Sequence, residues 1–262
     1  MRKISENLIN RMTKGDLQEL LKYIKTDNEL RLEVRQSGDA FVYYRKGIAL
    51  EIKGLKVDKK YGEVPPTNLA ISNPSEYFKL MKITIDKWLP NNKKRAEFDT
   101  QQKIAQCNQG KEDKYIILDM EYAFEQNQIQ KNRREKRGVF DLLGIEQKTN
   151  KIIFFEVKKG MGATKGKSGV EEHINDFKTD LFGRNSELFR VNLTNDIKNI
   201  IEDKIKLGLL NSLNIPDNID HSSFELVFVF HPDNESQIAD FKRELKDQYK
   251  LIIVKDNEYK LT

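Results

Sequence analysis

Residues 152–160 read IIFFEVKKG, and this stretch decides how the rest of the sequence is interpreted. The four apolar residues at its start predict a strand buried in the core. Because successive strand side chains point to opposite faces, Glu156 and Lys158 project together, while Phe155 and Val157 project the other way. Charges are expensive to bury, so this acid and this cation must be compensated by each other or by a ligand.

Two more carboxylates lie inside strand-like runs upstream. Asp141 has apolar residues on both sides in GVFDLLGI, and Glu121 lies within YIILDMEYAF. Two acids and a lysine at one sheet edge would form a compact site for Mg²⁺, which prefers oxygen ligands and keeps several waters. The metal would activate a water, and Lys158 would stabilise developing negative charge, a combination that suits phosphodiester hydrolysis. The alternative is that Asp141, Glu156 and Lys158 form a buried structural ion pair.

A Glu-x-Lys triplet alone is a weak signal, because it recurs along this lysine- and glutamate-rich chain. The strongest competitor is LEIKG, where Glu51 and Lys53 also lie in an apolar run. There the upstream acid, Asp39, lies in a Ser-Gly-Asp turn, and the strand belongs to an alternating, half-exposed hairpin. We therefore expect Glu51 and Lys53 on a solvated face and assign the site to Glu156.

The first ninety residues predict a small α+β domain. A short helix is expected at 15–26, followed by alternating apolar and polar residues around turns at 37–39 and 46–47, which indicate an antiparallel sheet. A helix at 73–89 would begin with Asn73 as its N-cap and Pro74 in its first turn. The sequence LPNN breaks this helix, so we predict an N-terminal accessory domain at 1–90 and a second domain at 91–262.

The second domain predicts a central mixed β-sheet flanked by helices, which makes the fold α/β. Ser168 and Glu171 form a capping box at the start of one helix, and Gly183 ends that helix. FELVFVFH is apolar throughout, as in a strand covered on both faces. The predicted order is helix 93–108, strands 115–124, 137–146 and 151–160, helices 168–183 and 186–210, strand 224–231, helix 234–247, and strands 251–254 and 258–261.

This order, with Asp141 followed by FEVKK, resembles the PD-(D/E)XK nuclease superfamily, the restriction-endonuclease-like, Mg²⁺-dependent phosphodiesterases. The resemblance covers roughly 93–231. It implies that Asp141 and Glu156 bind the metal, that Lys158 is the catalytic lysine, and that Mn²⁺ can replace Mg²⁺. The residue before Asp141 is Phe140 in place of the proline of the motif, a departure that is common in the superfamily.

The resemblance also draws attention to two helices. Many members carry a glutamate on the first core helix, and Glu97 matches it as a further catalytic residue and metal ligand, with Gln101 one turn later on the same face. Some branches carry a glutamine on the helix after the lysine strand. Here that helix offers Glu172, His173 and Asp176 instead, and His173 is kept as a candidate. A solvated helix charge explains Glu97 equally well, and a histidine such as His173 is most often an ordinary surface residue of a helix.

Basic segments flank the predicted site. Nucleic-acid contacts are expected from the basic run at 133–137 and from the lysines at 159–167, although ordinary solvated loops would explain the same charges. Their candidate residues are Arg133, Arg134, Arg137, Lys159, Lys165 and Lys167. The net charge of +5 over 262 residues is compatible with a polyanionic partner.

No run approaches the ~18 apolar residues of a membrane span, and the N-terminus lacks the apolar region of a secretory signal. The single cysteine, Cys107, fits a reducing compartment, so a cytoplasmic protein without a membrane partner is expected. The function predicted from the resemblance is a metal-dependent endo- or exonuclease with DNA as its substrate, as a monomer or a homodimer. The alternative is a nucleic-acid-binding or scaffold protein that keeps the fold without turnover.

Overall fold

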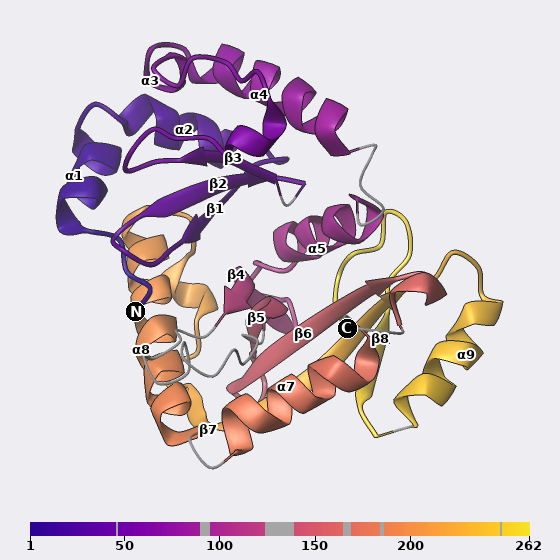
Figure 1. Cartoon of the computed structure of the whole chain (residues 1–262). Helices are drawn as coiled ribbons and strands as arrows, with labels where there is room; N and C mark the ends of the chain where they lie inside the picture. Colours follow the sequence, from indigo (N-terminus) through magenta and orange to yellow (C-terminus); the bar gives the residue numbers. More distant parts are fainter. Residues whose placement is uncertain (46, 90–94, 124–138, 165–168, 184–185, 247) are drawn as a thin grey trace, which may run out of the picture. The chain divides into compact units, whose positions relative to one another are not determined.

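The computed structural model describes residues 1–45, 47–89, 95–123, 139–164, 169–183, 186–246 and 248–262 (Figure 1). These residues form two compact units. The first comprises Met1–Gln102 and Lys198–Ser212, and the second comprises Lys103–Ile197 and Leu213–Thr262. The two units are defined by contacts between residues and do not test the predicted domain boundary at residue 90, which stays a prediction.

The first unit is built on the antiparallel sheet expected from the alternating sequence. Its strands lie in the order β1-β2-β3, with Leu32 opposite Val42 and Val42 opposite Leu50. Its elements are α1 (Glu6–Lys14), α2 (Gln18–Thr26), β1 (Arg31–Val34), β2 (Ala40–Tyr44), β3 (Gly47–Glu51), the 3₁₀ turn η1 (Lys59–Tyr61), α3 (Leu69–Ser72) and α4 (Pro74–Trp88). The start of α5 (Arg95–Cys107) and the end of α8 (Ser186–Lys206) also belong to it.

The helices of this unit pack on the sheet through aromatic side chains. Tyr77 of α4 donates a hydrogen bond to the carbonyl of Ala49 in β3 (2.9 Å), and Phe78 stacks on Tyr23 of α2. The start of α4 is as predicted, because the Asn73 side chain accepts a hydrogen bond from the Glu76 N–H (3.2 Å). Helix α1 was not predicted, although Ser5 caps it in the same way.

The second unit contains a five-stranded mixed sheet in the order β4-β5-β6-β7-β8. The strands are β4 (Tyr115–Ala123), β5 (Val139–Glu146), β6 (Lys151–Lys159), β7 (Asp220–His231) and β8 (Lys250–Ile253). β5 runs antiparallel to its neighbours β4 and β6, whereas β6, β7 and β8 are parallel. The predicted α/β fold with its central mixed sheet is therefore confirmed, and IIFFEVKK forms the middle strand of that sheet.

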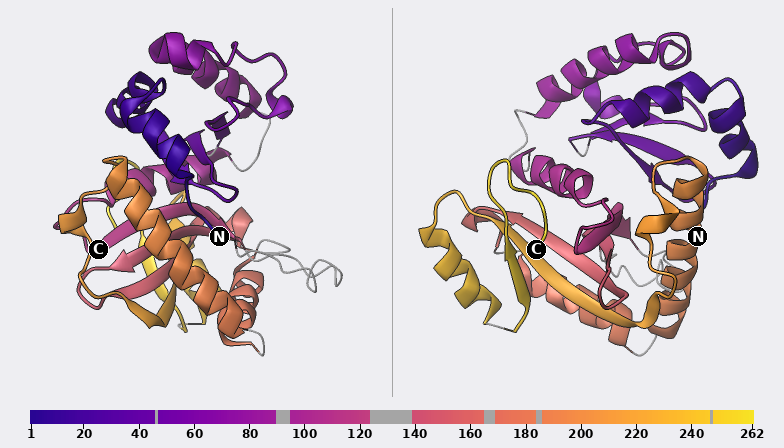
Figure 2. Two further views of the ribbon diagram at one scale, coloured as in Figure 1. Left: turned by 90° about the vertical axis from the view of Figure 1, so that its left-hand side faces the viewer. Right: turned by 180° about the vertical axis from the view of Figure 1, so that it is seen from behind.

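Helices flank this sheet. They are α7 (Val170–Phe182), the first part of α8 and α9 (Ser236–Leu245), with the 3₁₀ turns η3 (Met161–Ala163) and η5 (Ser212–Asn214) between elements. Phe177 of α7 packs edge-on against Phe154 of β6, and Phe241 of α9 stacks on Phe230 of β7 with ring centroids 4.3 Å apart. The view from behind in Figure 2 shows α9 on the side of the sheet where β8 forms the edge.

Two details differ from the expectation. The segment EYKL (258–261) forms no strand and contributes only an isolated bridge between Lys255 and Glu258. The N-cap of helix α7 is Gly169, which has no side chain that could accept a capping hydrogen bond. Ser168 of the predicted capping box lies outside the described residues. Gly183 ends α7 as predicted, donating its N–H to the Thr179 carbonyl (3.1 Å).

No helix among the described residues is long and apolar enough to cross a membrane.

The first unit also contains a buried charge cluster. Glu33 of β1 is fully buried, and its carboxylate pairs with Arg31 and, at 2.5 Å, with Lys204 of α8. Because all three side chains are buried, each charge depends on the others for compensation.

We expect Glu33→Ala to lower the free energy of unfolding by about 3–5 kcal/mol, because Arg31 and Lys204 would both lose a buried carboxylate that pairs with them. Glu19→Ala removes an exposed carboxylate that pairs with Lys22 and should change stability by less than about 1 kcal/mol. Urea denaturation of the full chain measures both, and equal small effects would show that the cluster contributes nothing to stability.

Candidate active site

The candidate site lies on β6 near its carboxyl end. β6 pairs with β7 so that Glu156 lies opposite Phe228 and Lys158 opposite Phe230. In open α/β sheets, ligands bind beyond the carboxyl ends of parallel strands, and these two residues lie in the last four positions of β6. Both are almost completely buried, with 1% and 2% of Glu156 and Lys158 exposed.

Glu156 and Lys158 form a direct ion pair. The Lys158 ammonium donates a hydrogen bond of 2.7 Å to Glu156 Oε1. The side-chain alternation predicted for this strand therefore brings the two groups together. Each of these two charges compensates the other, which keeps the structural explanation of the pair open.

Asp141 of β5 lies beside this pair. Its carboxylate oxygen Oδ2 accepts a hydrogen bond of 2.9 Å from the backbone N–H of Val157, the residue between Glu156 and Lys158. Burial and then the negative charge of Asp141 raise the pKa of Glu156, although the Lys158 ammonium opposes this rise. Two carboxylates and one ammonium thus meet at the end of β6, as the sequence predicts.

His173 of α7 is also brought to this cluster. Its Nε2 lies 2.9 Å from Glu156 Oε1, yet neither ring nitrogen makes a hydrogen bond within the described parts of the chain. Burial lowers the pKa of His173, but the contact with Glu156 outweighs it, so the pKa is raised overall. From the sequence alone, His173 is a candidate that a surface position on its helix explains better, and its contact with Glu156 has no signal there.

The second carboxylate oxygen of Glu156 has no hydrogen-bond partner among the described residues. Both Lys158 and His173 approach Glu156 Oε1, whereas Glu156 Oε2 is buried and has no hydrogen bond to any described residue. A buried oxygen without a partner costs about 1–3 kcal/mol, so this atom is suited to a cation. Glu156 and Asp141 together match the oxygen donors that Mg²⁺ prefers.

The described residues include no group of three or more His, Cys, Asp and Glu side chains arranged to hold a metal. Mg²⁺ does not require such a group, because it keeps several waters and often uses only one or two carboxylates with substrate phosphate. The donor set at the end of β6 fits that requirement.

Glu97 and Gln101 lie on α5, within the first unit. Glu97 is half-buried, and Gln101 is fully buried with no hydrogen bond from its amide to any described residue. Their participation in the site stays a prediction.

In β4 the buried carboxylate is not the one that the sequence emphasised. Glu121 is half-exposed with a φ of +53°, whereas Asp119 is fully buried and accepts a hydrogen bond from the Met120 N–H (2.9 Å). Asp119 lies opposite Leu143, two residues along β5 from Asp141. The same signal, an acid inside an apolar strand, would have found Asp119.

Lys159 differs from Lys158 in its surroundings. Its ammonium lies 3.0 Å from Asp233 in the loop after β7, and the side chain is partly exposed. The next residue, Gly160, has a φ of +64°, and a Cβ there would collide with the Asp233 carboxylate. This explains the glycine that closes IIFFEVKKG. The predicted nucleic-acid-binding residues Arg133, Arg134, Arg137, Lys165 and Lys167 lie outside the described residues.

The competing triplet has a different arrangement. β3 ends at Glu51, and Lys53 lies beyond it as an exposed side chain that donates a hydrogen bond to the Ser37 carbonyl (2.7 Å). Glu51 is half-buried, and burial followed by the charge of Asp39 raises its pKa. Lys53 is solvated as expected, and Glu51 less so.

Helix α7 carries another perturbed carboxylate beyond His173. Burial, followed by repulsion from Asp176, raises the pKa of Asp180 to about 7. Its Oδ2 is buried without a hydrogen bond to any described residue. The folded protein therefore holds a proton on Asp180 more tightly than the unfolded chain does.

Because the folded-state pKa is the higher one, the contribution of Asp180 to stability is present near pH 4 and is lost as the pH rises to about 7. Asp180→Asn should flatten this slope and stabilise the protein at pH 8 by about 1–2 kcal/mol, after allowance for solvent screening. Unfolding measured from pH 4 to 8 checks this, with the exposed Asp217→Asn as control. A parallel pH dependence in wild type and Asp180→Asn would contradict it.

Comparison of this chain with protein-family models, with curated proteins and with solved structures gave no match in any of the three.

Proposed function

We propose that this protein is a metal-dependent nuclease that hydrolyses phosphodiester bonds of nucleic acid, with DNA as its substrate. The observation that carries the proposal is the cluster of Asp141, Glu156 and Lys158 at the end of β6, in which Glu156 Oε2 is buried without a hydrogen bond to the described residues. Most buried polar atoms of folded proteins have a hydrogen-bond partner, so this oxygen supports a role in binding a cation.

Asp141 and Glu156 would hold a Mg²⁺ ion, which Mn²⁺ can replace. When bound, the ion lowers the pKa of a coordinated water and neutralises charge on the phosphate. The remaining roles belong to the chain itself. The Lys158 ammonium, fixed by Glu156 at 2.7 Å, is positioned to stabilise the negative charge that develops on the phosphate oxygens. His173 of α7 lies 2.9 Å from Glu156 Oε1, and a protonated imidazole there would stabilise the charge of this carboxylate.

Burial strengthens these electrostatic interactions. Lys158 and Glu156 are almost excluded from water, and charge interactions at such positions are screened less than at the surface. Pairing with β7 holds both residues, so their positions need little reorganisation when substrate binds. The net charge of +5 is compatible with a polyanionic substrate.

The competing explanation is a nucleic-acid-binding protein without turnover. It requires the same fold but gives no role to the unsatisfied Glu156 oxygen. Plasmid and oligonucleotide cleavage assays with Mg²⁺, compared with EDTA, separate the two, because binding alone leaves the substrate intact.

Asp141→Asn and Glu156→Gln should each weaken Mg²⁺ binding and abolish cleavage while the fold persists, because each removes one negative oxygen ligand. His173→Gln should weaken Mg²⁺ binding less, since His173 acts through Glu156. Calorimetric titration with Mg²⁺ measures the affinities, with the exposed Asp217→Asn as a control. Unchanged metal affinity in both carboxylate variants would rule out the proposed ligand pair.

Lys158→Met should lower the single-turnover cleavage rate by roughly 10²–10³, the loss expected when one electrostatic donor is removed. Lys159→Met should keep most of the rate at saturating substrate, because Lys159 pairs with the exposed Asp233 instead of Glu156. Substrate binding in Ca²⁺ should change little in either variant. Equal rates for the two variants would mean that the Lys158 pair is only structural.

A further inference from the structure

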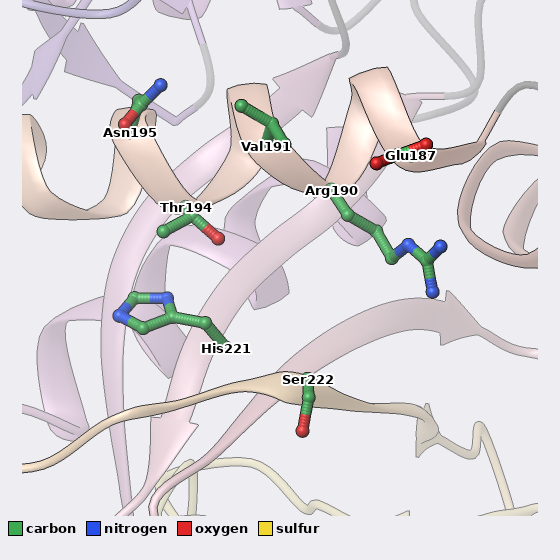
Figure 3. Close-up of a pocket in the computed structure, with 7 residues that line it drawn as sticks. All are labelled: Glu187, Arg190, Val191, Thr194, Asn195, His221 and Ser222. Atoms are coloured by element: carbon green, nitrogen blue, oxygen red, sulfur yellow. The ribbon is translucent and has the colours of Figure 1, made fainter.

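A second candidate site lies between α8 and the start of β7. The pocket has a volume of about 340 Å³ and is lined by Glu187, Arg190, Val191, Thr194, Asn195, His221 and Ser222. The five α8 residues recur at helical spacing along one face. Figure 3 shows Arg190 and Thr194 extending from α8 toward the strand that carries His221 and Ser222.

The polar side chains that α8 contributes to this pocket make no polar contacts within the described residues that hold the fold together. Arg190, Glu187, Thr194 and Asn195 make no side-chain hydrogen bond or ion pair in the part of the chain that the structure describes. Arg190 and Glu187 are one helical turn apart and yet do not pair. A guanidinium without a carboxylate is a good partner for a phosphate, which it can bind through two parallel hydrogen bonds.

An exposed aromatic ring lies close to this pocket. Phe182 is 56% exposed, and its ring packs edge-on against Phe224, which follows Ser222 by two residues in β7. Val191 and Leu188 add further apolar surface, with 52% and 49% exposed. Aromatic rings at such positions are suitable for stacking with the bases of nucleotides, whose identity they do not discriminate.

The geometry points to a nucleotide-binding pocket: we propose that it binds one nucleoside monophosphate unit, either free or as part of a single strand. The phosphate would lie against Arg190, and the base would contact Phe182 and Val191. Thr194 and Asn195 supply hydrogen bonds to the sugar or base. The single carboxylate of Glu187 can accept from a sugar hydroxyl and disfavours ligands with several phosphates.

This pocket is separate from the candidate active site. Ser222 precedes Phe228 by six residues in β7, and Phe228 is the residue paired with Glu156. At about 3.3 Å per residue, the pocket is roughly 20 Å from Glu156 along the strand. The proposal therefore does not depend on nuclease activity, and it would stand if the protein only bound nucleic acid.

The test measures binding to the full-length protein in EDTA, where metal-dependent cleavage is blocked. The probes are AMP, by calorimetry, and a fluorescent single-stranded oligonucleotide, by anisotropy. Arg190→Gln removes the phosphate contact, Phe182→Leu removes the ring but keeps an apolar side chain, and Lys178→Gln is the charge-matched control on the exposed face of α7.

Wild type should bind at least one probe, and Arg190→Gln should weaken that binding by roughly 10- to 100-fold. Phe182→Leu should weaken it by at least about fivefold, while Lys178→Gln stays within about twofold of wild type. Binding of AMP identifies a free nucleotide as a ligand, and binding of the oligonucleotide alone identifies a unit within a strand. Either result supports the pocket.

Two results would overturn the proposal. The first is no binding of either probe to wild type, and the second is an equal effect of Arg190→Gln and Lys178→Gln. Asp141→Asn, which should abolish cleavage, is expected to bind AMP like wild type. The failure of one proposal is thus distinguishable from the failure of the other.

Discussion

The ion pair between Glu156 and Lys158 is the interaction on which the candidate site depends. It puts a carboxylate and an ammonium into the middle strand of a five-stranded sheet, where the neighbouring strands exclude water from both. Such a pair gains little stability over apolar residues of similar volume. Glu156 Oε2 is buried without a hydrogen bond to any described residue, and the proposed metal site would give this oxygen a partner.

The residues around the pair follow from this requirement. Asp141 accepts a hydrogen bond from the backbone N–H of Val157 in β6, which keeps its carboxylate close to Glu156. α7 supplies His173 while Phe177, one turn later, packs on Phe154 of the same strand. Helix α7 thus contacts β6 in two ways: Phe177 packs on the strand, and His173 approaches the carboxylate of Glu156. The packing of Phe177 helps to hold His173 in place.

The sequence predicts much of this because the decisive strands are apolar runs with isolated charges. Alternation is enough to bring Glu156 and Lys158 together, and the mixed sheet follows from the order of the elements. Alternation fails in β4, where the pairing register shifts between Ile117 and Asp119 and Glu121 has a positive φ. A bulge of this kind reorients side chains, and as a result Asp119 is buried in place of Glu121. The contact of His173 with Glu156 joins two elements and has no local signature in the sequence.

The parallel pairing of β6 with β7 has a consequence for when the site exists. β5 and β6 are joined by a tight turn, whereas β7 begins about sixty residues after β6 ends. Contacts between such distant segments form slowly, because the intervening chain must be ordered first. During synthesis, β6 emerges long before β7 can cover its open edge, and Lys158 stays hydrated until then. In a nascent chain, Glu156 and Lys158 would therefore be exposed to water, which weakens the electrostatic interaction between them. Any chemistry at this strand would require the completed sheet.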